Sequence, residues 1–441
     1  MSSIAGSSVA SSDGARIEVS SGSPLSGRID VPGAKNSVLK LMAASLLGDG
    51  SCTITNAPAI IDVTIMADLL QALGAEVHIE SGSITITAAQ VHCVEPPADL
   101  VERMRASVNL LGPLLTRYGR VRLALPGGDD FGARPIDMHI AGLEAMGARV
   151  TLGERHLEAT SAGLHGADIA FDFPSVGATE NIVTAAVLAT GMTVIDGAAR
   201  EPEVVDLCRF LVGMGAEIEG IGGPRLTVRG TSGRPLGSVE HRVVPDRIQA
   251  ATYIAAVAVS GGRLEIVDAR PDDMEMFLRR CAEMGLEIEE WSDGRSDGIV
   301  VAREGRIRAV DVQTLPYPGI ATDYKPLVIT MLSVANGSAV VTENLYPGRF
   351  RYIDELTRLG ADIRTEGHHA LVRGVPNLRG CPVRAHDIRA GAAMVVAGLA
   401  AQGTTTITGV EHIDRGYDDL VGRLRSVGAH ITRLGEAGSA L

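Results

Sequence analysis

The chain has 441 residues, enough for two domains of about 200 residues each. A net charge of −13 and only 3% aromatic residues provide neither a basic face nor base-stacking platforms, so we do not expect a nucleic-acid partner. The longest run of small apolar residues, 390–401, is shorter than the roughly 18 residues of a membrane span, and the first residues lack the pattern of a signal peptide. Five scattered cysteines without a CxxC pair or a zinc-ligand spacing favour a reduced compartment, so we expect a cytoplasmic protein without a metal.

Six apolar helical stretches along the chain each end in a glycine that is followed by a strand. Successive glycines lie roughly 70 residues apart, a period that indicates an internal repeat. Each has the context of a helix C′ residue, at which a left-handed backbone conformation ends the helix. They are Gly74, Gly147, Gly215, Gly285, Gly360 and Gly428. This regularity predicts six copies of one structural unit.

Another helical stretch, rich in alanine and aliphatic residues, opens each unit and leads into a Thr/Val/Ile strand. Its low polarity predicts a helix that is buried on nearly all sides. The six stretches are 36–47, 105–118, 178–190, 248–260, 324–336 and 390–402. Each unit is therefore predicted to run helix, strand, helix, strand, strand. The segment 16–33 has the form of a final strand pair and is expected to complete the sixth unit from the front of the chain.

This closure predicts an α/β fold of two domains, each with pseudo-threefold symmetry. Units one to three would form an inserted domain over residues 35–245, and units four to six would combine with the N-terminal strands as residues 1–34 plus 246–441. Two crossings, near Gly33-Ala34 and Val244-Pro245, would join the domains and permit hinge closure over a ligand. A rigid repeat array is the alternative, but a solenoid does not close front to back.

Charged and polar residues recur where these helices begin. Helix N-termini offer free amide donors and a positive dipole, so openings that converge between two domains predict an anionic ligand in the cleft. Any one of these residues alone is better explained as a helix cap or a surface ion pair, and only the recurrence favours a site. At the first helices they are Lys35, Asn36, Arg103, Arg105, Ser175, Asp246, Arg247, Asp323, Asp387 and Arg389. At the second helices they are Arg134, Asp137, His139, Glu201, Glu203, Arg349 and Arg415. For the two glutamates we expect helix capping.

A series of short motifs occurs in order between about residues 16 and 434. They are GAKN at 33–36, MRAS at 104–107, LPGG at 125–128, GARPID at 132–137, SVGAT at 175–179, AAREPE at 198–203, PDRI at 245–248, TD at 322–323, RF at 349–350, DIRA at 387–390 and HIDRGY at 412–417. In this order they resemble the enolpyruvyltransferase family, in particular its UDP-N-acetylglucosamine 1-carboxyvinyltransferases. The resemblance implies the inside-out α/β barrel shared with the shikimate-pathway enolpyruvyltransferase.

The activity implied by the resemblance is transfer of the enolpyruvyl group of phosphoenolpyruvate to the 3-hydroxyl of UDP-N-acetylglucosamine. Addition of the hydroxyl and elimination of phosphate would proceed without a cofactor, as the first committed step of peptidoglycan precursor synthesis. The two partners are thus phosphoenolpyruvate and a uridine nucleotide, with no membrane involved. A carboxylate and a phosphate suit planar guanidinium groups. The residues that the resemblance assigns to phosphoenolpyruvate are Lys35, Arg105, Arg134, Arg349, Arg389, Arg415 and Asp387.

Two aspartates are implied in proton transfer. Asp323 resembles the base that takes the hydroxyl proton of the acceptor, and Asp129 is the residue implied as the acid. The resemblance places Asp387 beside the carboxylate-binding arginine, and a simple ion pair with Arg389 is an equal alternative for it. The family commonly has cysteine directly after LPGG on a mobile loop, where this sequence has Asp129 and then Asp130.

A carboxylic acid can act as general acid there if the closed site raises its pKa. The alternative for the two aspartates is a solvated loop tip. Fosfomycin alkylates the loop cysteine of the family, so the missing thiol predicts fosfomycin resistance. The catalytic residues implied are Lys35, Asp129, Asp323 and Arg415.

The resemblance also implies a uridine-binding loop, a diphosphate-binding turn and a sugar contact. The loop residues are Arg134, Pro135, Ile136, Asp137 and His139. The turn is Ser175, Val176 and Gly177, and the remaining nucleotide contacts are Asn36, Asp323 and Tyr346.

Two departures from the family pattern concern the acceptor. Tyr346-Pro347 stands where the family usually has Phe-Glu, and Tyr324-Lys325 directly follows the implied base, both where the sugar is expected. They leave open a paralogue that enolpyruvylates UMP at its ribose 3′-hydroxyl in nucleoside antibiotic synthesis, with Lys325 meeting a phosphate. A catalytically silent nucleotide-binding relative is disfavoured, because binding alone requires neither the phosphoenolpyruvate arginines nor the base.

Overall fold

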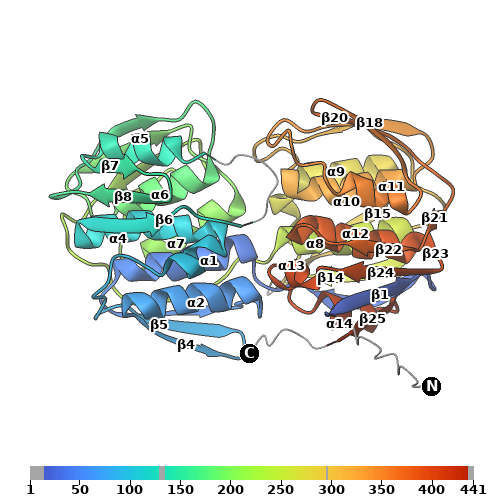
Figure 1. The fold of residues 1–441 in the computed structure, drawn as a ribbon, viewed down its shortest axis with the longest axis horizontal. Helices are drawn as coiled ribbons and strands as arrows, with labels where there is room; N and C mark the ends of the chain where they lie inside the picture. The colour runs from blue at the N-terminus through green and yellow to red at the C-terminus, as the bar shows by residue number, and fades with distance from the viewer. Residues whose placement is uncertain (1–13, 129–134, 295, 436–441) are drawn as a thin grey trace, which may run out of the picture.

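Two hydrophobic cores organise the computed structural model, which describes residues 14–128, 135–294 and 296–435. One core runs from Val38 to Val243, and we call its part of the molecule the inserted lobe. The other combines Ile17 to Val31 with Ile248 to Ile431 and forms the terminal lobe. Figure 1 shows the lobes side by side, joined at the middle of the molecule. The expected domain boundaries at 34/35 and 245/246 stay a prediction.

The first helix of each unit lies inside its lobe. In the terminal lobe α8, α10 and α12 pack against one another, and in the inserted lobe α4 packs against α6. Alanine and aliphatic side chains permit this close packing, since they bury no polar group. The first helices are α1 (Lys35–Ala44), α4 (Leu111–Tyr118), α6 (Val176–Ala186), α8 (Arg247–Ser260), α10 (Lys325–Ser333) and α12 (Ile388–Ala400).

The second helices end at the six predicted glycines. All six glycines have positive φ, between 91° and 103°, so the chain turns from helix to strand through a left-handed residue as expected. These helices are α2 (Ile61–Leu73), α5 (Asp137–Ala145), α7 (Pro202–Gly213), α9 (Glu275–Met284), α11 (Ile353–Arg358) and α14 (Leu420–Ser426). Short helices complete the set: α3 (Ala98–Glu102), α13 (Val410–Asp414) and the 3₁₀ turns η1 (Ser45–Leu47), η2 (Arg105–Leu110), η3 (Pro271–Asp273) and η4 (Thr322–Tyr324).

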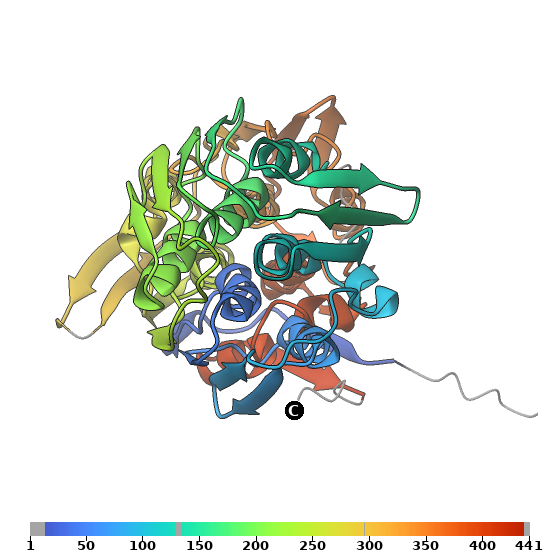
Figure 2. The same cartoon turned by 90° about the vertical axis from the view of Figure 1, so that its left-hand side faces the viewer.

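Sheets cover the outside of both lobes, and Figure 2 shows them around the helices of the inserted lobe. The described residues of that lobe form the sheets β13 (Val239–Arg242), β3 (Ser51–Thr55), β5 (Ser83–Thr87), β4 (Glu76–Glu80); β6 (Arg120–Ala124), β8 (His156–Thr160), β7 (Arg149–Leu152); and β11 (Glu217–Glu219), β12 (Arg225–Arg229), β10 (Met192–Asp196), β9 (Asp168–Ala170). Helices inside and sheets outside make the inside-out α/β fold that was predicted.

The terminal lobe repeats this pattern. Its described sheets are β15 (Glu287–Ser292), β16 (Asp297–Arg303), β14 (Gly262–Val267), β2 (Leu25–Asp30); β17 (Val312–Gln313), β18 (Ser338–Thr342), β20 (His369–Arg373), β19 (Asp362–Glu366); β22 (Pro382–Arg384), β24 (Thr404–Thr408), β1 (Arg16–Ser20), β25 (His430–Leu434); and the small pair β21 (Leu378–Arg379), β23 (Ala401–Gln402).

A short extra strand links neighbouring units in a way that the sequence pattern did not predict. It leaves its own unit and pairs parallel with the next sheet, as β9 does with β10 and β13 with β3. The N-terminal strands therefore separate: β1 joins β24 and β25 of the sixth unit, whereas β2 runs parallel to β14 of the fourth. Strand β2 thus closes the terminal lobe as β13 closes the inserted lobe.

The two chain crossings lie next to each other and are hydrogen-bonded together. Ala34 N donates to Val244 O at 2.8 Å, and Asp246 N donates to Pro32 O at 2.8 Å. Such a narrow, paired connection allows the lobes to rotate about it. Within the described part of the chain, every helix is too short or too polar to traverse a bilayer.

Candidate active site

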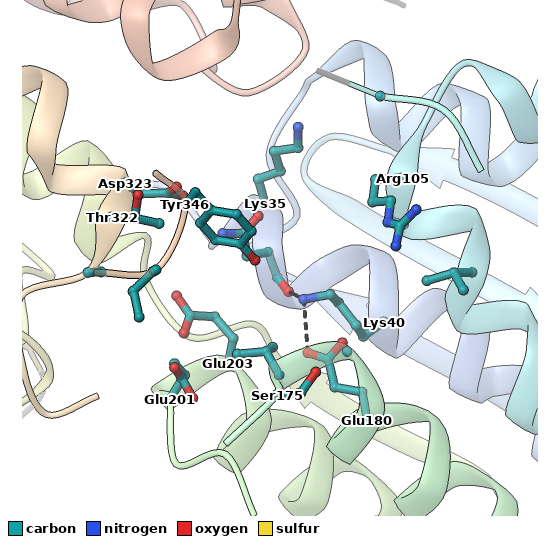
Figure 3. A pocket seen from close by; sticks show the side chains of 18 of the residues that line it. Lys35, Lys40, Arg105, Ser175, Glu180, Glu201, Glu203, Thr322, Asp323 and Tyr346 are labelled. Carbon is teal, nitrogen blue, oxygen red and sulfur yellow. Dashed lines mark hydrogen bonds and ion pairs between the residues drawn. The ribbon is translucent and has the colours of Figure 1, made fainter. Parts of the chain in front are cut away.

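A cavity of about 530 Å³ lies between the lobes. The segments that open all six first helices contribute to its lining, which is the convergence that the repeat predicted. Figure 3 shows Lys35, Arg105 and Ser175 on the inserted side and Thr322, Asp323 and Tyr346 on the terminal side. Helix N-termini that point at one space favour a negatively charged occupant. The lining residues from these openings are Lys35, Asn36, Arg105, Ser175, Val176, Gly177, Arg247, Asp323 and Arg389.

Asp62 joins two cations from different lobes at the cavity. Lys35 Nζ lies 2.8 Å from Asp62 Oδ2, and Arg415 Nε donates to Asp62 Oδ1 at 2.9 Å. All three residues line the cavity, and Asp62 is 1% exposed. Sequence reasoning missed Asp62, although it opens the second helix of unit one, the unit position at which Glu203 and Arg415 were noticed.

Asp323 holds a second pair of cations. Arg349 Nη1 donates to Asp323 Oδ1 at 2.7 Å, and Arg389 Nε donates to Asp323 Oδ2 at 3.3 Å. Burial alone would raise the pKa of Asp323, but Arg349 and Arg389 outweigh it and hold the pKa well below its usual range. The carboxylate is therefore ionised at neutral pH and lies against the two arginines.

Glu203 forms a further bridge between the lobes instead of the expected helix cap. Arg247 donates from Nε and Nη2 to the two carboxylate oxygens of Glu203, at 3.0 and 3.2 Å. Neither Glu203 nor Glu201 makes a side-chain cap to α7. Glu201 also lines the cavity, and burial raises its pKa. Capping was thus the wrong expectation for Glu203, because the arginine that it meets comes from the other lobe.

Lys40 and Glu180 make a lysine–carboxylate pair that was not predicted. Lys40 Nζ lies 2.9 Å from Glu180 Oε1, and Asn109 Nδ2 donates to Glu180 Oε2 at 3.2 Å (Figure 3). All three line the cavity on the inserted side. Burial raises the pKa of Glu180, while Lys40 opposes this rise. Lys40 lies one turn after the GAKN motif, so only the helical period could have pointed to it.

The predicted nucleotide residues are brought together in part. Ser175 caps α6, with its Oγ accepting from Ala178 N at 3.4 Å, and Tyr346, Pro135 and His139 line the cavity with Asn36 and the 175–177 turn. His139 is buried and accepts at Nδ1 from Asn181 Nδ2 at 2.9 Å. Burial and then Arg105 lower the pKa of His139 to about 4, so the ring is neutral at physiological pH.

Other predicted residues lie away from the lining. Ile136 and Asp137 begin α5 without lining the cavity. Asp387 caps α12 by accepting at Oδ1 from Arg389 N and Ala390 N, both at 2.8 Å, and it also lies outside the lining. Asp129, Asp130 and Arg134 fall outside the described residues. Gly128 and Pro135, the described residues on either side of 129–134, both line the cavity.

The expectation that Tyr324 and Lys325 meet the acceptor is wrong. Tyr324 is 1% exposed, Lys325 is wholly buried, and neither lines the cavity. Lys325 Nζ instead lies 2.8 Å from Glu343 Oε2. The sequence placed these residues next to Asp323 but could not show that the helix turns their side chains into the core. In the described residues no group of three His, Cys, Asp or Glu side chains is arranged to hold a metal ion.

Comparisons with known proteins show the family of the chain. The family model of EPSP synthase (3-phosphoshikimate 1-carboxyvinyltransferase) matches residues 19–424. A UDP-N-acetylglucosamine 1-carboxyvinyltransferase from Mycobacterium leprae is 47% identical over 419 residues, which cover 95% of this chain and 99% of that protein. Another, from Nitratidesulfovibrio vulgaris, is 44% identical over 421 residues, covering 96% of this chain and 100% of the relative.

Solved structures show the same fold. The enolpyruvyl transferase NikO from Streptomyces tendae superimposes with a TM-score of 0.85 at 25% identity, covering 95% of this chain and 98% of that one. An EPSP synthase from Acinetobacter baumannii gives a TM-score of 0.73 at 18% identity, covering 96% and 100%, which supports the fold alone. Because the family model and the relatives span nearly the whole sequence, the chain belongs to the EPSP synthase family of enolpyruvyl transferases, and within it to the UDP-N-acetylglucosamine 1-carboxyvinyltransferases.

Proposed function

We propose that this enzyme transfers the enolpyruvyl group of phosphoenolpyruvate to the 3-hydroxyl of UDP-N-acetylglucosamine and releases phosphate. The observation that carries the proposal is the pair of ionic clusters in one interlobe cavity, Lys35 and Arg415 around Asp62, and Arg349 and Arg389 around Asp323. Two separate cationic groups suit a substrate with two anionic ends. The names of relatives at 44–47% identity support the acceptor.

Phosphoenolpyruvate would lie with its phosphate toward Lys35 and Arg415 and its carboxylate toward Arg349 and Arg389. Arg389 Nη1 is buried and has no hydrogen-bond partner among the described residues, so a substrate carboxylate would satisfy it. Arg105, Arg134 and Asp387 remain proposed contributors, with Arg105 at the cavity wall. Hinged approach of the two lobes would bring the two clusters onto the same substrate.

Asp323 would act as the base toward the acceptor hydroxyl. Its low pKa in the unliganded site makes it a weak base, because Arg349 and Arg389 stabilise its charge. A bound substrate carboxylate would share these arginines and so raise the pKa of Asp323 when the reaction needs it. Proton transfer would thereby depend on phosphoenolpyruvate being in place.

Asp129 would donate the proton to the methylene carbon, on a segment whose flanking residues Gly128 and Pro135 line the cavity. A carboxylate is a poor nucleophile toward an epoxide, so the enzyme should resist fosfomycin, and Asp129→Cys should become sensitive while keeping some turnover. The check is residual activity against preincubation time for both forms. Time-dependent inactivation of the unmodified enzyme would contradict the role of Asp129.

For the acceptor, Asn36, Ser175 to Gly177, Pro135, His139 and Tyr346 would hold the nucleotide sugar, with Ile136 and Asp137 supporting from α5. The argument for UMP that rested on Lys325 falls, since Glu343 holds this lysine in the core. Mass spectrometry of products formed from phosphoenolpyruvate with UDP-N-acetylglucosamine or with UMP tests the choice. Enolpyruvyl-UMP as the main product would overturn it.

Peptidoglycan precursor synthesis in the cytoplasm is the setting that we propose for this reaction. The five cysteines are scattered through the sequence without a CxxC pair, a pattern that suits a reducing compartment. In this proposal enolpyruvyl transfer requires neither a metal nor a cofactor, because the arginines balance the charge of phosphoenolpyruvate. Undiminished phosphate release in the presence of a chelator is the expected result.

A further inference from the structure

Behind the terminal wall of the cavity lies an ion pair with no assigned role in the reaction. Lys325 and Glu343 are both fully buried, 2.8 Å apart, and neither side chain lines the cavity. Burial lowers the pKa of Lys325 to about 8, although Glu343 opposes this effect. A buried ion pair is weak evidence for stability, because apolar side chains of similar volume often stabilise a core at least as well.

Glu343 accepts hydrogen bonds from three segments of the chain through its two oxygens. Its Oε1 accepts from the backbone N–H of Leu345 at 2.8 Å and of Tyr346 at 3.0 Å, and from Thr314 Oγ1 at 2.7 Å. Its Oε2 accepts from Thr322 Oγ1 at 2.8 Å, beside Lys325 Nζ. One carboxylate thus ties the segment 344–350, which carries Tyr346 and Arg349, to the turn η4, which carries Asp323.

Arg349 is held by the same network at both of its ends. Lys325 Nζ donates to the backbone carbonyl of Arg349 at 2.6 Å, and the ammonium lies 3.9 Å from the centre of the Phe350 ring. At the other end, Arg349 Nη1 donates to Thr322 Oγ1 at 3.3 Å, and Thr322 in turn donates to Glu343. The contacts close into a ring that fixes both the start and the tip of the arginine.

We propose that Lys325 and Glu343 are positioning residues that fix the Arg349 guanidinium against Asp323, and with it the approach of the phosphoenolpyruvate carboxylate to the base. This inference rests on the proposed function, since it assigns Arg349 and Asp323 to the substrate. Because catalytic groups lose much of their effect when displaced by about 1 Å, a ring that fixes one arginine at two points bears directly on turnover. The nucleotide contacts on the inserted lobe lie outside this ring.

The test compares Glu343→Gln with the double variant Lys325→Met, Glu343→Gln. The single change keeps one side-chain oxygen for the segment 344–350 but removes the acceptor charge, and the double change also removes the lysine that would otherwise be left charged in the core. Thr330→Val is the matched control, since Thr330 is fully buried on the same helix and its hydroxyl donates to Pro326 O at 2.9 Å.

We expect both Glu343 variants to lower kcat/KM for phosphoenolpyruvate by roughly 10- to 100-fold, with kcat falling as well. Affinity for UDP-N-acetylglucosamine, measured by calorimetry without phosphoenolpyruvate, should fall less than affinity for phosphoenolpyruvate, since of the proposed nucleotide-sugar contacts Glu343 holds Tyr346 alone. The double variant should recover melting temperature relative to Glu343→Gln but not turnover, a separation that a purely structural pair would not produce. Thr330→Val should lose melting temperature and keep kcat/KM.

A folded double variant with the kcat/KM of the unmodified enzyme overturns the inference and leaves the proposed function standing. An unmodified enzyme that releases no phosphate overturns the proposed function instead. The inference is then decided by calorimetric affinity for phosphoenolpyruvate alone: loss of affinity in the Glu343 variants supports it, and equal affinity overturns it.

Discussion

The first helices of units one and five both begin with a lysine, and the two lysines differ in what covers them. Lys35 opens α1 and Lys325 opens α10, and each lies 2.8 Å from a carboxylate that follows the next strand, Asp62 or Glu343. The two carboxylates nevertheless come from different unit positions, since Asp62 lies in α2 whereas Glu343 directly follows β18. Lys35 borders the cavity, whereas Lys325 is wholly buried.

The covering segment accounts for this difference. The segment 344–350 covers Lys325. The Phe350 ring lies on the Lys325 ammonium, and Tyr346 of this segment lines the cavity whereas Lys325 does not. At Lys35 the opposing residue is Arg415 of the other lobe, which shares Asp62. Both units thus place a carboxylate against the lysine that opens the first helix, and the neighbouring segments determine whether the pair lines the cavity or supports residues that do.

The largest effect is expected at Asp323, the carboxylate that the buried pair serves through Arg349. Asp323→Asn removes the proposed base but keeps the side chain's shape, so kcat should fall by roughly 10²- to 10⁴-fold. Affinity for UDP-N-acetylglucosamine should stay nearly intact, which is the signature of lost proton transfer. Phosphate release and calorimetry measure the two quantities. Near-normal turnover would mean that another group is the base.

The cavity-facing pair should respond differently from the buried pair. Asp62→Asn leaves Lys35 and Arg415 without their shared carboxylate, so the two cations lose their common anchor at the proposed phosphate site. We expect kcat/KM for phosphoenolpyruvate to fall by about 10- to 100-fold, mainly through a higher KM. Steady-state kinetics of Asp62→Asn and Glu343→Gln, measured side by side, distinguishes an effect on KM from an effect on kcat. If KM and kcat change in the same proportion in both variants, the cavity-facing and buried pairs do not differ as we expect.

For the free energy of unfolding, we expect the buried pair to matter more than the cavity-facing pair. Lys325→Met leaves Glu343 charged in the core without its cation, which should lower the free energy of unfolding by about 3–5 kcal/mol. Lys35→Met should lower it by less, because Asp62 keeps Arg415 at 2.9 Å. Denaturant unfolding without substrates gives both values. A larger loss for Lys35→Met would show that the two pairs have the opposite roles in stability.

Much of the fold could be predicted because its determinants are local. The six glycines mark helix ends by a backbone requirement, and the alanine-rich stretches mark buried helices by composition. The exchange of short strands between units could not be read in the same way, since parallel pairing of β13 with β3 joins residues almost 190 positions apart. Local pattern carries no information on such register.

The site was predictable to the extent that its residues open helices. Lys35, Asp323 and Arg389 were identified by unit position and by motif, and the structure brings them to one cavity. Asp62 occupies the same kind of position and was overlooked, whereas Lys325 was given a ligand's role because it follows Asp323. Which way a side chain turns at a helix start depends on packing from elsewhere in the chain, here the segment 344–350.

A last expected effect is a pH dependence that belongs to the buried pair. Burial lowers the pKa of Lys325 from its ordinary value of 10.5 to about 8, with Glu343 opposing. Between these values the unfolded chain keeps a proton that the folded chain has released, so the unfolded state binds more protons and stability rises with pH. Below pH 8 the lysine is charged in both states and contributes no slope.

The free energy of unfolding of the unmodified enzyme, minus that of Lys325→Met, should therefore increase from pH 8 to pH 10.5 and be flat from pH 7 to 8. Taking a difference removes the titration of groups that both proteins share. Thr330→Val removes no titratable group. The free energy of unfolding of the unmodified enzyme minus that of Thr330→Val should therefore stay constant over the whole pH range. Denaturant unfolding at half-unit pH steps measures all three proteins. A difference that decreases above pH 8 would mean that Glu343 stabilises the charged lysine more than burial destabilises it, and that the pair contributes to stability as an ion pair.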